Sequence, residues 1–273
     1  MKFSTLTSAV LLASTLTAQA QDRNLPMWEV GVVGGILTMP AYPASTERTS
    51  RALILPFVLY RGEVLRIDRG TISARVVHAQ DYEFDIGFAA SLPASSNDIA
   101  ARSGMPDLGT LVEFGPRLKM VMARPTQGSQ VRFELPVRAV LEINQGVRSQ
   151  GMTVEPELIY ETRDLSADWR WSASGSLVWG DRQLNNYFYG VTPEFATPTR
   201  SAYEAQAGLI ATRLGLSAAK SLTPDVRLYG FVRYERYDNG ANRASPLYLQ
   251  DHGTSVGIGL TWTLSRSERR AAD

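Results

Sequence analysis

The sequence predicts an all-β protein, a transmembrane antiparallel β-barrel of the outer membrane with about 12 strands, or 10 if one short stretch lies outside the wall. Two observations support this prediction. Many segments alternate between apolar and polar residues over lengths above the ~5–6 residues of soluble strands and close to the ~9–11 that cross a bilayer at a tilt. After residue 20, no apolar run approaches the ~18 residues that a membrane-spanning helix needs.

The expected strands follow one another along the whole chain. The clearest are residues 131–143, where every odd position is apolar, and 81–92, where every even position is apolar. Residues 63–68 and 71–78 give two shorter strands joined by a turn at Arg69 and Gly70, which brings the count to 12. The ten long strands are expected at residues 28–39, 51–60, 81–92, 107–122, 130–143, 150–163, 168–180, 201–218, 225–237 and 253–264.

A soluble β-sandwich would also alternate, because its apolar faces meet in a shared core. Here the polar faces carry Arg together with Glu or Asp, and aromatic residues gather near strand ends. A polar lumen, an apolar outer face and aromatic girdles at both membrane interfaces are typical of outer-membrane barrels. We therefore expect the apolar faces to contact outer-membrane lipid. The girdle residues are Trp28, Tyr60, Tyr82, Tyr160, Trp169, Trp179, Tyr203, Tyr237 and Trp262.

The ends of the chain indicate the compartment. Residues 1–20 have the features of a secretory signal peptide, with Lys2, a short apolar stretch and an Ala-Gln-Ala cleavage site. Residues 21–264 then form a single barrel domain, and 265–273 form a short charged tail that we expect to be solvated. The 28 Lys and Arg balance the 27 Asp and Glu, which gives no argument for nucleic acid, and there is no Cys. The predicted location is the outer membrane of a Gram-negative bacterium.

Four long polar connections, at residues 40–50, 93–107, 181–200 and 238–253, share one end of the barrel if the number of strands is even. Bacterial barrels keep short turns and both chain ends on the periplasmic side and longer loops outside, so these four are expected to be extracellular. Four prolines inside the strands each remove a ladder donor, which predicts bulges or local openings. They are Pro56, Pro116, Pro136 and Pro156.

The inward faces of the middle strands carry charges of both signs. If the hairpins are symmetric about residues 125–126 and 145–147, Arg117 faces Glu134 and Glu113 faces Arg138. Glu155 then also faces Arg138, and Glu161 faces Arg132. Such pairs fix the strand register and neutralise charges that would be costly to desolvate alone. Two interpretations stay open. The charges either fill the lumen or line a path for ions or solutes, and the mixed signs favour the first.

Four motifs resemble the MipA/OmpV family of outer-membrane proteins over essentially the whole mature chain. They are Leu55-Pro56-x-x-x-Tyr60, ARSGMPDL at residues 101–108 with the following Glu113-x-Gly115-Pro116, DRQLNNYFYGV at 181–191, and Ala244-Ser245-Pro246-Leu247. The resemblance implies a non-enzymatic envelope scaffold whose partners are a murein lytic transglycosylase and a murein synthase. A small-solute or antibiotic-permeable channel is the alternative, because the family is functionally diverse.

The loop motifs supply the candidate interaction residues, which either fill the barrel mouth as a plug or bind a partner. In the plug interpretation, Arg102 pairs with Asp107 or Asp181. No catalytic residue, metal site or cofactor is expected, and a hydrolase site built on His252, Asp251 and a nearby serine is the least favoured function. The candidate loop residues are Arg102, Gly104, Met105, Asp181, Asn186, Tyr187, Tyr189, Gly190, Ser245 and Pro246.

Overall fold

The computed structural model describes residues 25–61, 65–68, 71–78, 81–90, 96, 99–143, 146–164 and 168–271. The predicted signal peptide at residues 1–20 and the turn at Arg69 and Gly70 lie outside these residues. Within them, no helix is long and apolar enough to cross a membrane.

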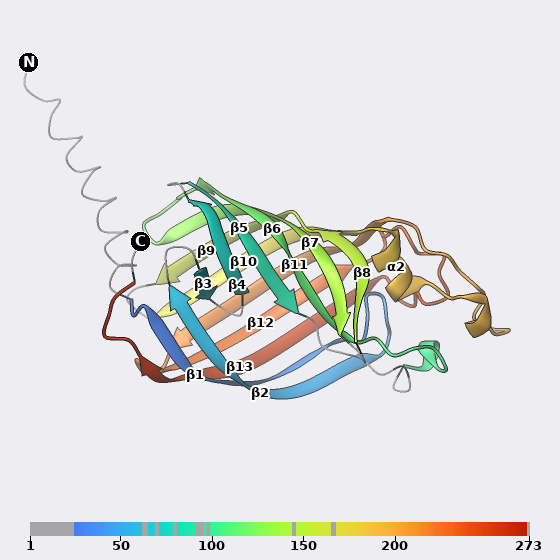
Figure 1. The fold of residues 1–273 in the computed structure, drawn as a ribbon, viewed down its shortest axis with the longest axis horizontal. Helices are drawn as coiled ribbons and strands as arrows, with labels where there is room; N and C mark the ends of the chain where they lie inside the picture. The colour runs from blue at the N-terminus through green and yellow to red at the C-terminus, as the bar shows by residue number, and fades with distance from the viewer. Residues whose placement is uncertain are drawn as a thin grey trace, which may run out of the picture.

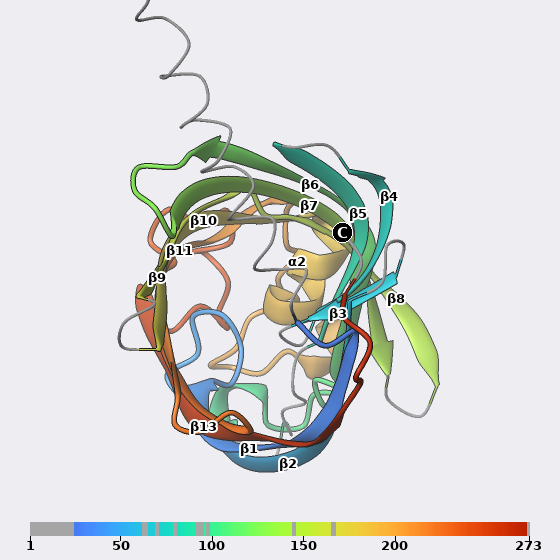
Figure 2. The same cartoon turned by 90° about the vertical axis from the view of Figure 1, so that its left-hand side faces the viewer.

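The described chain folds into antiparallel strands arranged as a barrel (Figures 1 and 2). Each strand pairs with its neighbours in sequence, except that β8 and β9 do not pair with each other and instead both pair with β7 and β10. Because β13 also pairs with β1, the pairings run in a ring. The strands are β1 (Trp28–Pro40), β2 (Arg48–Arg61), β3 (Leu65–Asp68), β4 (Thr71–His78), β5 (Tyr82–Ala90), β6 (Thr110–Ala123), β7 (Ser129–Ile143), β8 (Val147–Val154), β9 (Glu157–Asp164), β10 (Trp169–Gly180), β11 (Gly208–Ser221), β12 (Val226–Arg236) and β13 (His252–Arg266). Short helical turns are α2 (Arg182–Tyr189), η2 (Ala100–Arg102) and η3 (Pro193–Phe195).

These strands correspond to the twelve predicted ranges with two corrections. The predicted strand 150–163 is two strands, β8 and β9, because the backbone leaves the ladder at Glu155 and Pro156, and both parts pair with β7. The predicted strand 201–218 begins only at Gly208. The residues before it belong to the loops at the barrel mouth, where the backbone of Tyr203 pairs with that of Val191.

The prolines lie where the ladders are interrupted or end. The β6–β7 ladder has no direct pairing at Gly115 and Pro116, and Pro156 lies in the break between β8 and β9. Pro56 lies in β2, which pairs with β1 along its whole length but with described β3 only at Tyr60 and Arg61. No described strand pairs with the rest of that edge of β2, the edge that faces β3. The missing N–H of Pro56 therefore removes no described ladder bond on that side.

The outer face of the barrel is apolar. The side chain of Ile54 is 80% exposed and that of Leu216 61%, and the even positions of β13 from Val256 to Leu264 are all exposed. In a protein of the outer membrane, such a surface faces lipid. Two predicted girdle residues are wrong, because Tyr237 is fully buried and Tyr203 packs among the mouth loops. The exposed girdle contains Trp28, Tyr82, Trp169, Trp171, Trp179 and Trp262.

The two ends of the barrel differ. The four long connections gather at one end, the mouth end, with α2 and the adjoining ends of β7 and β8 (Figure 1). The described chain ends and the short turns that follow β6 and β11 lie at the other end, the turn end (Figure 1). The charged residues of the predicted tail, Arg266, Glu268, Arg269 and Arg270, are exposed, but the tail is paired through its backbone. Strand β13 runs to Arg266, and beyond it the N–H of Ala271 donates to the carbonyl of Leu25 at 2.8 Å. The tail therefore extends the pairing of the two chain ends.

Candidate functional site

The long connections of the mouth end form a mouth cap, defined here as residues 41–47, 99–109, 181–207 and 237–251. All ten loop residues predicted as candidates lie in it. Much of the described buried apolar core also lies here, in two clusters that join the cap to the neighbouring ends of β6, β7, β10 and β11. Seen from the turn end, α2 lies within the outline of the barrel (Figure 2). The buried residues of these two apolar clusters are Tyr42, Ala44, Ile99, Leu108, Leu111, Val140, Val178, Leu184, Tyr189, Val191, Ala205, Ile210, Ala211, Tyr237 and Leu247.

The motif at residues 181–191 forms a capped helix. Asp181 is the N-cap of α2, and its Oδ1 accepts a hydrogen bond from the N–H of Leu184 at 2.8 Å. Asn186 closes the other end, because its carbonyl accepts from the N–H of Gly190 and its Oδ1 accepts from the N–H of Ala205 at 2.7 Å. A Cβ on Gly190 would lie 2.6 Å from the Asn186 carbonyl oxygen, so the position requires glycine.

The motif at residues 244–247 joins two loops of the cap. The buried Ser245 hydroxyl donates to the carbonyl of Tyr189 at 2.7 Å and accepts from the N–H of Leu247. The hydroxyl of Tyr42 donates to the Leu247 carbonyl at 2.8 Å, and burial raises the pKa of Tyr42 to about 12. Pro246 is half-buried in the same loop.

Arg102 lies buried in the cap without the predicted carboxylate partner. Its guanidinium donates to the carbonyls of Phe188 at 3.3 Å and Pro106 at 3.4 Å rather than to Asp107 or Asp181. It also lies over the ring of Tyr42, 5.8 Å from the centroid. Burial lowers the pKa of Arg102. The loop after it turns at Gly104, whose φ of +78° favours glycine. Met105 packs against the cluster that contains Tyr42 and Leu247.

Sequence reasoning missed a pair of buried amides that hold the cap together. The Nδ2 of Asn242 donates to the Oδ1 of Asn185 at 2.8 Å and to the carbonyl of Gln206. The Nδ2 of Asn185 donates to the carbonyls of Gly180 and Asp181. These residues are 57 positions apart, so no local pattern identifies the pair.

One strand carboxylate, which was also missed, links the cap to the wall. The Oε1 of Glu142 in β7 accepts from the N–H of Gly109 at 2.8 Å and from the hydroxyl of Tyr187 at 3.0 Å. Its Oε2 accepts from the Nε2 of Gln150 at 2.8 Å. The buried Glu142 therefore connects two cap segments and the neighbouring strand.

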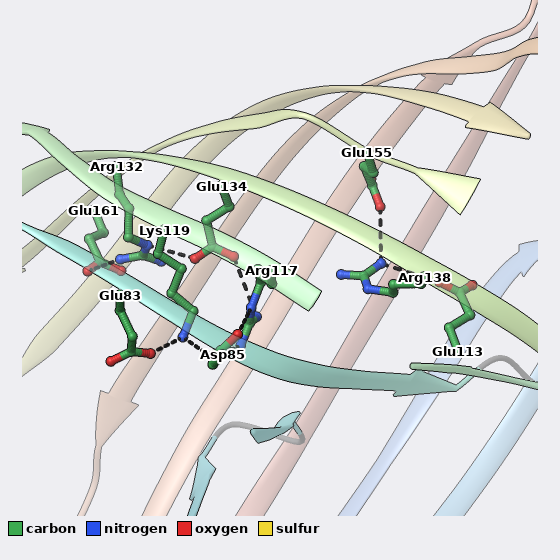
Figure 3. Close-up of polar contacts among 10 residues, drawn as sticks. All are labelled: Glu83, Asp85, Glu113, Arg117, Lys119, Arg132, Glu134, Arg138, Glu155 and Glu161. Carbon is green, nitrogen blue, oxygen red and sulfur yellow. Dashed lines mark hydrogen bonds and ion pairs between the residues drawn. The ribbon is translucent and has the colours of Figure 1, made fainter. Parts of the chain in front are cut away.

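Below the cap, the inward side chains of the middle strands form the predicted charge network (Figure 3). All four predicted ion pairs are present. Their N–O distances are 3.5 Å for Arg117–Glu134, 3.3 Å for Arg138–Glu113, 3.6 Å for Arg138–Glu155 and 2.8 Å for Arg132–Glu161.

The register that led to these pairs was nevertheless wrong by two residues. The residue directly opposite Glu134 is Lys119 rather than Arg117, and the residue opposite Glu161 is Gln130 rather than Arg132. A shift of two keeps each side chain on the same face of the sheet, and long charged side chains reach their diagonal neighbours. The pairs therefore form diagonally across the ladders.

The network extends beyond the predicted residues. Asp85 is fully buried and accepts two hydrogen bonds from Arg117, at 3.0 and 2.8 Å, while Lys119 reaches it at 2.7 Å. On the other side, Arg213 bridges Glu155 at 2.9 Å and Glu235 at 2.5 Å. Charges of both signs thus alternate around one half of the lumen, which favours a filled and mutually neutralised interior over a ring of one sign.

The hydrolase alternative finds no assembled site in the part of the chain that the structure describes. His252 stacks on the ring of Tyr234 with centroids 6.1 Å apart, and no hydrogen bond joins it to Asp251, Ser245 or Ser255. Asp251 instead accepts from the Tyr248 hydroxyl at 2.7 Å. The same described residues contain no group of three or more His, Cys, Asp or Glu arranged to hold a metal ion.

The family of the chain is decided by its match to a family model. The model described as MltA-interacting protein MipA matches residues 31–264, which is most of the chain. The chain belongs to the MipA family. It is accordingly a barrel protein of the outer membrane, as the resemblance implied. No functionally curated protein matches this MipA-family chain.

Solved structures with a similar arrangement include barrels of several kinds. A bacterial polysaccharide outer membrane secretin shares 9% identity at a TM-score of 0.42, covering 89% of this chain and 99% of that one. Outer membrane phospholipase A from Escherichia coli shares 12% at 0.38, covering 88% and 91%. An anion-selective porin from Comamonas acidovorans shares 10% at 0.34, covering 87% and 100%. Likeness at this level gives no ground for transferring any of their activities to the MipA-family chain.

Proposed function

We propose that this MipA-family barrel is a non-enzymatic platform of the outer membrane that holds murein-metabolising enzymes at its turn end. The observation that supports this most directly is the construction of that end. The N–H of Met27 donates to the carbonyl of Arg269, and Trp28 and Ser267 exchange two hydrogen bonds. The described residues up to Ala271 therefore present a paired backbone, and Glu268 and Arg269 are exposed on it.

Orientation favours the turn end over the mouth cap as the docking surface. Bacterial barrels keep both chain ends and the short turns in the periplasm, where murein is processed, and direct their longer loops outward. The family description, MltA-interacting protein, gives the class of partner. The cap residues named by the motifs bond to one another, which fits a plug better than a surface for an enzyme.

The lumen also fits a platform better than an ion channel. Arg117, Arg132 and Arg138 each lie within 4 Å of two carboxylates, so the charges neutralise one another. Cross-strand pairs of this kind hold the register of a sheet and stiffen it.

Site-specific cross-linking in cells tests the proposal, because a chain without Cys gives a unique thiol in any single-cysteine variant. Gln127→Cys and Glu268→Cys place the thiol at exposed positions of the turn end, and Glu194→Cys places it on the cap as the matched control. Expected products, captured with a thiol–amine cross-linker and identified by mass spectrometry, are a lytic transglycosylase or a murein synthase from the first two variants only. Recovery of no murein enzyme, or equal recovery from Glu194→Cys, would contradict the proposal.

A further inference from the structure

The lumen is chemically two-sided. The charge network covers the inner faces of β5, β6, β7, β9 and β11, whereas the inner faces of β1, β2 and β13 carry mainly glycine, small hydroxyl, aliphatic and aromatic residues. The inner face of β12 combines both kinds, because Tyr229 and Phe231 lie between Arg227 and the charged residues Arg233 and Glu235. In β2, apolar residues occupy both faces, because Leu53 and Leu55 point inward while Ile54 points to lipid. This second half is unusual for a barrel interior, which is normally polar.

Glycines on the inner face allow aromatic rings to lie flat against the wall. A Cβ on Gly257 would lie 2.5 Å from the Cε1 of Phe231, whereas one on Gly31 would lie 2.0 Å from the backbone oxygen of Trp262 as well as 2.7 Å from the Cε1 of Phe57. The Tyr229 ring covers Gly259 in the same way. Because the rings occupy the space that side chains would fill, they do not project across the lumen.

A pocket of about 130 Å³ lies in front of these rings. Among described residues it is lined by six residues with inward side chains, Val33, Leu37, Leu53, Leu55, Tyr229 and Phe231, together with Gly35, Gly257 and the outward-facing Ile36 and Ile258. No charged residue is among them, and the Tyr229 hydroxyl is their one polar side-chain group. The side chain of Leu55 is 50% exposed although it faces inward.

We propose that this pocket binds a small uncharged apolar molecule of about the size of one aromatic ring. A dry cavity of ~150 Å³ lined by Leu, Ile and Phe side chains is large enough for benzene, and the present pocket has similar size and lining. Binding removes the exposed face of Leu55 from water and offers the ring faces of Tyr229 and Phe231 for stacking. A charged or sugar-like solute finds only the Tyr229 hydroxyl as a side-chain partner for its polar groups there. The site is independent of the platform role, because it lies inside the barrel rather than at the turn end.

Thiol protection tests the proposal on the complete barrel. Leu55→Cys places the unique thiol of the chain in the pocket, and Ser172→Cys places one on the inner face of β10, two strands away from the pocket residue Phe231. Each variant is folded into lipid vesicles, checked for the heat-dependent gel migration of a folded barrel, and treated with a water-soluble methanethiosulfonate. The probe is p-cresol, and myo-inositol is the polar control.

The expected result is that p-cresol slows modification of Leu55→Cys at least about fivefold and saturably, whereas Ser172→Cys is modified at an unchanged rate and myo-inositol affects neither. Leu53→Cys, a second position in the pocket, replaces Leu55→Cys if that variant fails to fold. Equal slowing at both positions, no slowing by p-cresol, or no modification of either pocket thiol would overturn the proposal.

Discussion

Removal of the Glu142 carboxylate is expected to release the mouth cap without unfolding the barrel. The carboxylate accepts from the N–H of Gly109, the hydroxyl of Tyr187 and the amide of Gln150. In Glu142→Ala, the first two donors stay buried or half-buried and lose their acceptor, and each such loss costs ~1–3 kcal/mol. We therefore expect the cap to lose about 3 kcal/mol of local stability, while the strands far from it keep theirs.

Hydrogen exchange measures this directly, because cap amides exchange through local opening. A loss of about 3 kcal/mol corresponds to roughly hundredfold faster exchange. Tyr187→Phe should lose only the one charge-assisted bond, ~1.5–3 kcal/mol, and the double variant should show a coupling energy of similar size with Glu142→Ala. Glu161→Ala, in the lumen network away from the cap, is the control and should leave cap exchange unchanged. Unchanged exchange in Glu142→Ala, or equal acceleration in β12 and β13, would refute the reasoning.

Three further predictions follow from buried or strained groups. Arg117→Met should cost ~1.5–3 kcal/mol, because the buried Asp85 loses both hydrogen bonds from Arg117 and keeps only Lys119. Arg102→Met removes a buried charge that has two carbonyls and the Tyr42 ring as partners, and it should change stability by about 1 kcal/mol or less. Urea unfolding followed by tryptophan fluorescence compares the two variants, and equal costs would contradict the assignment. Gly104→Ala should cost ~1–2 kcal/mol in the same assay through its positive φ alone, because a Cβ there meets no atom within 4 Å. Burial raises the pKa of Tyr42 from 10.0 to about 12. The stability that the neutral, buried Tyr42 gives the cap is therefore present below pH 10 and is lost as the pH rises from 10 through 12. Tyrosinate absorbance at 295 nm should show a high-pH titration step in the unmodified protein that is absent from Tyr42→Phe.

The strands and the charge pairs could be predicted because both depend on local alternation. Placing each hairpin centre one residue away from its true position changes the register by two, which returns every side chain to the same face. For this reason the pairing of Arg132 with Glu161 survived a wrong register. The break at Pro156 was foreseen as a bulge or opening, but its division of one strand into β8 and β9 depends on how both parts fit the long β7.

The cap could be predicted only as a set of loops that share one end. Its cohesion comes from contacts between residues far apart in the sequence, such as Tyr42 with Leu247 and Asn185 with Asn242. Those contacts depend on how four connections pack together, which periodicity does not report. The motif residues lie in the loops where they were predicted, but their roles were not foreseen. Asp181, for example, caps a helix in a segment that was expected to be a loop.

The glycines of the apolar half of the lumen are not explained by a platform role. Glycine inside a strand is less stable than alanine by ~0.5–1 kcal/mol, and four of them, Gly31, Gly35, Gly257 and Gly259, face the lumen on the adjacent strands β1 and β13. A binding pocket gives Gly257 and Gly259 a use, because they leave room for the rings of Phe231 and Tyr229, whereas Gly31 and Gly35 lie first against the backbone of β13. Gly257→Ala should push the Phe231 ring into the pocket and abolish p-cresol protection of Leu55→Cys, while the cross-linking of Glu268→Cys to murein enzymes stays unchanged. Protection that survives Gly257→Ala would show that the ring does not shape the pocket.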